Sequence, residues 1–288
     1  MDYTSKELKD KVYHQIRENL PSEVKILYIC LTGSQGKNMA SAESDYDVRV
    51  IIQNPFESYI LQRPKQNIAI KTELDGKELE GQAIDIIKAF DYALETNAFM
   101  VDLLRGIPMF CESKELIDEL RRVFHTGFLP IVPLYAFQGI LYHYLSRELK
   151  EKPKGKEKHQ EREFLEKVPV KAIVECIFVI LEIRCVLAEK DILNYFDIDK
   201  LMEFAGEDEG VMRPLIQLRR TDRKQKVPVS EEVKKLIEKT LASVDEFREK
   251  YTKEKKQEAT SNRATLRTEI DKICLEMICG GARNTAGK

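Results

Sequence analysis

Two short groups of residues carry the strongest chemical signal in this sequence. Gly33 and Ser34 directly follow an apolar run, and ten residues later Asp45 and Asp47 stand at the head of a second apolar run. A Gly-Ser pair at the end of a strand can present backbone N–H groups and a hydroxyl to phosphate. Two carboxylates at i and i+2 of a strand share one side and favour a hard cation. Together they predict phosphoryl or nucleotidyl transfer with Mg²⁺ or Mn²⁺.

The elements around these residues support that interpretation, although either group alone is more often a turn or a capping pair. The β-branched, apolar runs at 24–32 and 47–53 predict two buried strands. The segment between them is rich in Gly, Ser, Ala and Asn, which predicts a turn and a short helix. The site would therefore lie where the first strand ends and the second begins.

Hydrophobic periodicity predicts the other elements. Residues 5–20 place an apolar side chain at every fourth position and stop at Pro21, as in an amphipathic helix. Asp75-Gly76 indicates a hairpin between strands at 66–74 and 77–85. Further helices are predicted at 86–96, 98–105, 113–125, 131–149, 168–190, 197–206, 230–250 and 263–279.

A charged segment suggests how the chain is divided. Residues 150–167 hold seven Lys or Arg and five Glu, with one Pro and one Gly, which predicts a solvated basic linker between an α/β part and an all-α part. The predicted domains are 1–128 and 129–288. The polar stretch at 252–262 is expected to fray.

Composition excludes several classes of protein. The 288 residues are 43% hydrophobic and 33% charged, which is typical of a globular chain, and the net charge of −2 provides no overall attraction to nucleic acid or anionic lipid. The apolar stretch at 170–187 is interrupted by charges and predicts a buried helix, so no membrane association is expected. The N-terminus has no apolar secretory segment, which favours a cytoplasmic location and leaves a nuclear one open.

The cysteines and histidines do not form a metal-binding pattern. Six cysteines include no C-x-x-C pair, and four histidines are scattered, so we expect no zinc site and no disulfide framework.

The stretch LTGSQGKNMASAESDYDVRVI resembles the signature of the DNA polymerase β-type nucleotidyltransferase superfamily. It is most similar to predicted nucleotidyltransferases, some of which are encoded beside RNA ligases. The spacing from Gly33 to Asp47 matches that pattern without a gap. Residues 84–110 are similar to a second segment of the family, and a weaker similarity runs from Lys171 to Arg184.

In the second segment, the family's Asp, Lys and Asn are matched by Asp85, Lys88 and Asn97. Ala98 stands where the family has Pro, and Asp102 where it has Glu.

The resemblance implies an α+β fold: a polymerase-β-like α/β domain with a mixed sheet, followed by a helical domain. It also implies a third carboxylate, for which this chain offers Asp85; the alternative role of Asp85 is the N-cap of the helix that begins at Ile86. The expected catalytic residues and metal ligands are Asp45, Asp47 and Asp85. The expected nucleotide-binding residues are Gly33, Ser34, Lys37, Lys171 and Arg184.

Several residues near the motif leave alternatives open. Gln35, Lys37 and Asn38 replace the family's Arg, Tyr and Gly, which affects substrate choice more than the metal site. Lys37 either supplies a cation near the phosphates or is solvated. Arg49 either pairs with a site carboxylate or faces solvent.

The predicted reaction moves a nucleoside monophosphate from a nucleoside triphosphate, with ATP favoured, to a hydroxyl, and releases pyrophosphate. We favour an RNA 3′ end as the acceptor because of the resemblance, with RNA contacts from the basic linker and the cluster Arg219-Arg220-x-x-Arg223-Lys224. A protein AMP-transferase is the first alternative, since it suits the near-neutral charge. An inactive nucleotide-binding scaffold is the second, and the three aspartates oppose it. The sequence leaves the nucleobase and the oligomeric state open.

Overall fold

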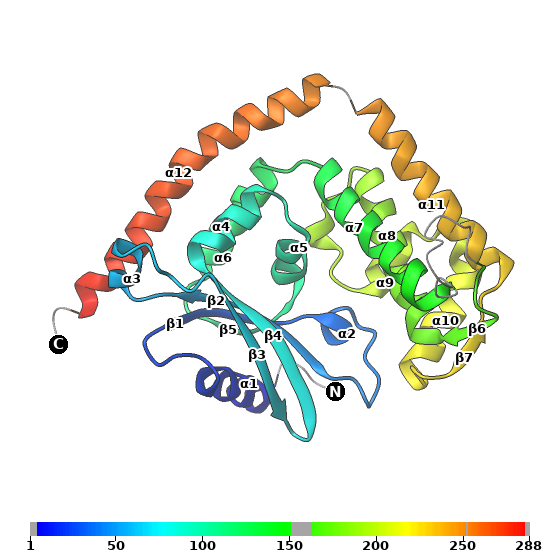
Figure 1. The fold of residues 1–288 in the computed structure, drawn as a ribbon, viewed down its shortest axis with the longest axis horizontal. Helices are drawn as coiled ribbons and strands as arrows, with labels where there is room; N and C mark the ends of the chain where they lie inside the picture. The colour runs from blue at the N-terminus through cyan, green and yellow to red at the C-terminus, as the bar shows by residue number, and fades with distance from the viewer. Residues whose placement is uncertain (1–4, 151–162, 252, 286–288) are drawn as a thin grey trace, which may run out of the picture. The chain divides into compact units, whose positions relative to one another are not determined.

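The computed structural model describes residues 5–150, 163–251 and 253–285 (Figure 1). These residues form two compact units. The first contains 5–36, 43–129 and 253–285, and the second contains 37–42, 130–150 and 163–251.

The first unit is built on a five-stranded mixed sheet. Its strands are β1 (Lys25–Leu31), β2 (Tyr46–Gln53), β3 (Asn67–Leu74), β4 (Lys77–Asp85) and β5 (Ile107–Cys111). They lie in the order β3-β4-β2-β1-β5. The pair β2 and β4 is parallel, whereas the other neighbouring strands are antiparallel. The predicted α+β fold with a mixed sheet is confirmed.

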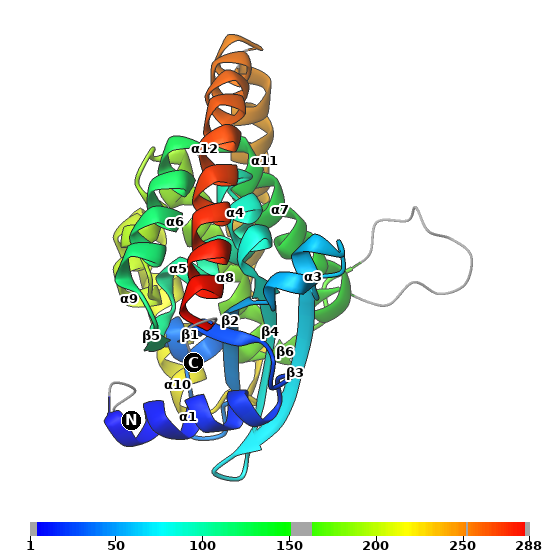
Figure 2. The same cartoon turned by 90° about the vertical axis from the view of Figure 1, so that its left-hand side faces the viewer.

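Helices cover both faces of this sheet (Figure 2). They are α1 (Lys6–Glu18), α2 (Gly33–Gly36), α3 (Phe56–Ile60), α4 (Ile86–Leu94), α5 (Ala98–Arg105), α6 (Lys114–Thr126) and α12 (Lys253–Thr285). The buried stripe of α1, Leu8, Val12 and Ile16, packs on alternate residues of the central strands, including Val48 and Val50. Helix α4 packs on β2 and β4 from the opposite side.

The turns follow from local chemistry. Asp75 and Gly76 join β3 to β4 with φ of 50° and 75°, as the two central positions of a type I′ hairpin require. Helix α1 begins after Ser5, whose side chain accepts a hydrogen bond from the Leu8 N–H.

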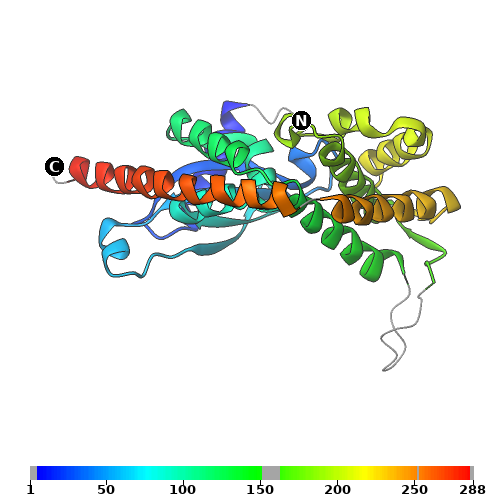
Figure 3. The same ribbon diagram turned by 90° about the horizontal axis from the view of Figure 1, so that it is seen from above.

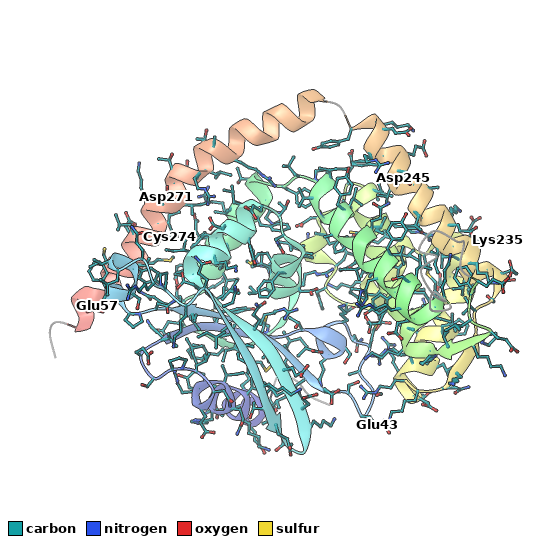
Figure 4. The ribbon with its side chains drawn as sticks, viewed as in Figure 1. Glu43, Glu57, Lys235, Asp245, Asp271 and Cys274 are labelled. Atoms are coloured by element: carbon teal, nitrogen blue, oxygen red, sulfur yellow. The ribbon has the colours of Figure 1, made fainter. Side chains whose placement is uncertain are left out.

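The long helix α12, the orange to red helix of Figure 3, belongs to the first unit by its contacts. It contacts α3, α4 and α6. Four buried residues at four-residue spacing face them, namely Leu266, Ile270, Cys274 and Ile278. Figure 4 labels Cys274 and its neighbour Asp271 on this helix. A domain boundary near 128 therefore describes the chain incompletely, because the expected second domain included these C-terminal residues.

The second unit is helical around α8 (Val170–Leu187), in which only Lys171, Arg184 and Leu187 are not buried. Helices α7, α10 and α11 pack on it. The other elements of the unit are α7 (Ile131–Tyr144), η1 (Leu145–Leu149), β6 (Lys167–Pro169), η2 (Ile192–Asn194), α9 (Ile198–Leu201), η3 (Met202–Phe204), η4 (Gly206–Asp208), α10 (Glu209–Thr221), β7 (Lys226–Pro228) and α11 (Glu231–Lys250).

Two expectations need correction. The predicted linker at 150–167 does not separate the two units, because its ends lie inside the second unit, where Lys150 pairs with Phe164 and β6 pairs with β7. Its central part, 151–162, lies outside the described residues. The segment expected to fray is helical from Lys253 onward. The sequence did not predict the helix α3 or the strands β5, β6 and β7.

No single helix in the described ranges has the length and apolar character of a membrane span. The helical segments Lys114–Thr126 and Ile131–Leu149, taken together, have the length and composition of a span, and nothing more.

Candidate functional site

The Gly33 backbone lies close to the Asp47 side chain. The N–H of Thr32 donates to the carbonyl of Asp47 at 2.8 Å, which joins the end of β1 to the start of β2. Gly33 has a φ of +55°, and a Cβ placed there would lie 1.9 Å from Asp47 Oδ2. Both the left-handed backbone and the close approach therefore require glycine at this position. The result is a backbone turn packed directly against a carboxylate.

Gln35 fixes the other side of the loop. Its Nε2 donates to the Asp45 carbonyl at 2.8 Å, so the short helix α2 is bonded to the residue that precedes β2. The Gln35 side chain is buried, and its Oε1 has no hydrogen-bond partner among the described residues. Asp45 is exposed and Asp47 is half-buried. Strand alternation turns Asp47 away from the buried Tyr46, and hence away from α1.

Asp85 lies at the other end of the strands, contrary to the expected convergence of three aspartates. Parallel pairing of β2 with β4 aligns Asp47 with Glu80 and Ile52 with Asp85. The five residue steps from Glu80 to Asp85 span about 16 Å at the usual rise of a strand. Asp85 therefore does not join Asp45 and Asp47.

Asp85 instead has a complete set of structural partners. Its side chain is buried, and Oδ1 accepts the Ile87 N–H at 3.0 Å as the N-cap of α4. Oδ2 accepts from Asn54 Nδ2 and from the Tyr59 hydroxyl, each at 2.6 Å. The alternative interpretation of Asp85 as a helix cap is the one that the structure supports.

Glu80 is the carboxylate that the register brings beside Asp47. The two residues are partners on neighbouring strands, which lie about 4.8 Å apart in a sheet. Glu80 pairs with Lys71 at 2.7 Å, and this hydrogen bond lowers the pKa of the Glu80 carboxyl. Sequence reasoning missed Glu80, because the parallel pairing joins strands that are far apart in the chain.

Asp45 and Asp47 offer oxygen donors of the kind that Mg²⁺ prefers. Within the described ranges, no group of three His, Cys, Asp or Glu side chains is placed to hold a metal ion. Mg²⁺ in phosphoryl-transfer sites commonly takes one or two protein carboxylates and completes its shell with phosphates and water. The oxygen donors of Asp45 and Asp47 fit that partial site, and Gly33 leaves free the space beside Asp47 that a Cβ would fill.

Arg49 takes neither of the two expected positions. Its guanidinium carbon lies 4.7 Å from the centre of the Phe99 ring, a cation–π contact. Its Nε is buried and has no hydrogen-bond partner in the part of the chain that the structure describes.

The three expected cationic nucleotide ligands lie in the second unit. Lys37 Nζ is 3.8 Å from Glu175 Oε2 and 4.4 Å from the centre of the Phe178 ring. Lys171 is exposed in the first turn of α8.

Arg184 is largely committed to its own unit. Its Nη2 lies 2.5 Å from Asp208, and its Nη1 donates to the carbonyls of Phe204 and Ala205 at 3.2 and 2.8 Å. These contacts give Arg184 a structural role that does not need a nucleotide.

The basic cluster at the end of α10 is also partly structural. Arg219 is only 1% exposed, so its expected contact with RNA is wrong. Arg220 is bonded to the Asn38 carbonyl and to Asp199.

Comparison with known proteins identifies the family. The model of the family described as "RlaP: RNA repair pathway DNA polymerase beta family" matches residues 6–273. A nucleotidyltransferase-like protein from Exiguobacterium sibiricum is a structural match with a TM-score of 0.29 and 10% identity, covering 84% of this chain and 73% of that one. A search of curated proteins gives no match. The chain therefore belongs to the RNA-repair-pathway family of DNA polymerase β-type nucleotidyltransferases.

Proposed function

We propose that this protein transfers a nucleoside monophosphate from a nucleoside triphosphate, preferably ATP, to the 3′ hydroxyl of an RNA and releases pyrophosphate. The observation that carries the proposal is the close approach of the Gly33 backbone to the Asp47 carboxylate. Membership in a family described by an RNA repair pathway supports nucleic acid as the acceptor.

In the proposed reaction, the hydroxyl oxygen of the acceptor forms a bond to the α-phosphorus. The bond from that phosphorus to the bridging oxygen breaks, pyrophosphate leaves, and the hydroxyl proton passes to solvent. Gly33 and Ser34 would offer backbone N–H groups and a hydroxyl to the triphosphate. Helix α2 has only four residues, so this role depends on close approach rather than on a helix dipole. A Mg²⁺ held by Asp45 and Asp47 would neutralise phosphate charge and lower the pKa of the attacking hydroxyl.

The test uses each α-labelled nucleoside triphosphate with MgCl₂, with and without RNA, and follows the label into RNA, protein or neither. The wild type should label RNA, preferentially from ATP. Asp47→Asn should lower the rate by at least about a hundredfold, because it removes one carboxylate from the site. Asp85→Asn is the matched control and should retain transfer at a temperature where it is folded. Equal rates for Asp47→Asn and the wild type would refute the catalytic assignment.

Protein AMP-transfer is the second candidate, and one observation favours it. Two arginines of the cluster expected to bind RNA phosphates are engaged within the protein, Arg219 by burial and Arg220 by Asn38 and Asp199. Fewer surface cations remain for a polyanion, while the net charge stays at −2. Label that appears on a protein hydroxyl and never on RNA would favour this candidate.

A further inference from the structure

Four side chains of the first unit form a continuous row, in which two aromatic rings lie between two cations. The row consists of Arg49 on β2, Phe99 on α5, and Tyr92 and Lys88 on α4. The Arg49 guanidinium carbon lies 4.7 Å from the centre of the Phe99 ring, and Lys88 Nζ lies 5.2 Å from the centre of the Tyr92 ring. The two rings meet edge to face with their centres 5.8 Å apart. All four residues are half-buried, so this cation–aromatic row lies at the surface of its unit.

The row begins beside the candidate site. Arg49 follows Asp47 by two residues on β2, so the two side chains share a face of the sheet, with Cα atoms about 7 Å apart. Helix α4 contacts both β2 and α5 (Figure 1). It starts after Asp85, at the opposite end of the paired strands from Asp47. From Arg49 to Lys88, the row therefore leads away from Asp47 toward the first turn of α4.

The row lies on a flank of α4 that α12 does not contact. Tyr92 and Lys88 are one turn apart on that flank. Asp91, which pairs with Arg267 of α12, lies about 100° around the helix from Tyr92. The buried residues of α4, including Phe90 and Ala93, lie between these two flanks on the side that faces the sheet.

The two cations of the row are not committed to other groups. Among the described residues, neither Lys88 nor Arg49 makes an ion pair or a side-chain hydrogen bond, and the Arg49 Nε is buried without a partner. Arg220, by contrast, is bonded to a carbonyl and a carboxylate. A guanidinium that stacks on a ring keeps its N–H groups at its edge, where they can donate to phosphate.

Single-stranded RNA carries both groups that such a row recognises. Its unpaired bases present flat faces that stack on aromatic rings, and its backbone presents phosphates to Lys and Arg. In a duplex the base faces are stacked on one another and are not available to the rings. Two adjacent rings with one cation at each end match stacked bases that are joined and flanked by phosphates.

We propose that the cation–aromatic row binds the single-stranded 3′ end of an RNA, with bases on Tyr92 and Phe99 and phosphates on Lys88 and Arg49. Because the row begins beside Asp47, an RNA bound in this way has its terminal hydroxyl close to the candidate site. The choice of RNA as acceptor rests on the proposed function, whereas RNA binding by the row is measured without any transfer.

The first test removes the rings. Tyr92→Leu and Phe99→Leu each replace a ring by an aliphatic side chain, and Tyr135→Leu is the matched control, because Tyr135 is a 47% exposed tyrosine of the second unit. Fluorescence anisotropy measures binding of the full chain to a labelled single-stranded RNA of about a dozen nucleotides, and to a duplex of the same sequence. Tyr92→Leu and Phe99→Leu should each weaken binding to the single strand by at least about fivefold. The control should bind like the wild type, and the duplex should bind more weakly than the single strand.

The second test removes the charges. Lys88→Gln and Arg49→Gln each remove one cation, and Arg63→Gln is the control, an exposed arginine that follows α3. The affinity for the same single strand is measured from about 50 to about 200 mM NaCl. Each of the two row variants should reduce the slope of log affinity against log salt by about 0.7, because one phosphate contact is lost. The ring variants and Arg63→Gln should keep the slope of the wild type.

The transfer assay separates a binding role from a structural one. Tyr92→Leu should raise the KM for RNA and leave the KM for ATP within about twofold of the wild type. All variants are compared below their melting transitions. If a ring variant does not fold, Lys88→Gln decides, because it alters only a half-buried side chain at the surface.

Three results would overturn the proposal: RNA binding by Tyr92→Leu that equals that of Tyr135→Leu, salt slopes that are unchanged in both charge variants, or a duplex that binds as tightly as the single strand. A wild type that binds no RNA at low salt would overturn it too. If the wild type binds RNA through the row but transfers no nucleotide, the proposed function fails and the row stands. Transfer to RNA with a KM that the row variants leave unchanged would have the opposite meaning.

Discussion

Replacing Asp85 should weaken the fold without damaging the chemistry. The carboxylate caps α4 and accepts two further hydrogen bonds, from Asn54 and Tyr59, in a buried setting. In Asp85→Ala the lost cap costs about 1 kcal/mol. One N–H of the buried Asn54 loses its acceptor, which costs about 1–3 kcal/mol. The half-buried Tyr59 hydroxyl also loses its acceptor, which costs about 1 kcal/mol. We expect a total of about 4 kcal/mol.

A loss of this size is readily measured. At about 2–4 °C for each kcal/mol, calorimetry should show a melting temperature lower by about 10 °C or more. Asp85→Asn keeps an acceptor for the cap but presents an amide, so it should cost less than Asp85→Ala. Below its melting transition, each variant should retain nucleotide transfer within a few fold of the wild type.

Asp47→Asn is the opposite case and provides the control. It should lose transfer while its melting temperature stays within about 3 °C of the wild type, because Asp47 is half-buried at the edge of the site. The assignment of Asp85 to the fold is refuted if Asp85→Ala melts like the wild type. It is equally refuted if Asp85→Asn stays folded but loses transfer as completely as Asp47→Asn.

Three further predictions test other parts of the structure. Gly33→Ala should weaken nucleotide affinity, measured by titration calorimetry, by at least about tenfold, because the new Cβ would meet Asp47. Gly139→Ala is the control and should leave the affinity unchanged, because Gly139 faces open space on a helix. Burial, and after it the hydrogen bond to Asp85, raises the pKa of the Tyr59 hydroxyl. The stabilisation that this protonated hydroxyl provides is therefore complete below about pH 10 and is lost as the pH rises above that value. Denaturant unfolding at pH 10 and 11 should show the wild type losing about 1 kcal/mol more than Tyr59→Phe, and equal losses would contradict this assignment. Ile270→Ala on α12 should lower the stability of the first unit by about 2–5 kcal/mol in the same measurement; no change would mean that α12 does not complete its core.

The elements nearest the motif could be predicted because their signals are local. The apolar repeat of α1, the β-branched runs of β1 and β2 and the Asp75-Gly76 turn each specify a structure within a few neighbouring residues. The strand β5 was missed because five residues that include Pro108 give little pattern, and its position is fixed by pairing with the distant β1. Helix α12 was expected to start later because its first turns are polar, which a sequence pattern reads as fraying.

The candidate site was predictable only where its residues are close in sequence. Gly33 and Asp47 are joined by one loop, and their contact follows from the two strands that this loop connects. The partner of Asp47 on β4 depends on a parallel register that is set by tertiary packing, so Glu80 carried no local signal. Asp85 was predicted as a metal ligand because an aspartate at a strand end serves equally well as a metal ligand and as a helix cap. Only its hydrogen-bond partners distinguish the two roles.

The burial of Arg219 could have been predicted from its spacing on α10, although its charge suggested an exposed RNA contact. Because it belongs to a basic cluster, its charge alone predicts contact with RNA phosphates. Its spacing from Met212 and Ile216 is seven and three residues, so it continues the buried stripe of α10. A cation on a buried stripe must find hydrogen-bond acceptors inside the protein, since it cannot keep its water. The carbonyl of Met39 accepts one such bond and the carboxylate of Glu175 lies 3.7 Å from Nη2, while Nε has no hydrogen-bond partner among the described residues. The bond to Met39 ties α10 to the segment that follows the Gly-Ser turn.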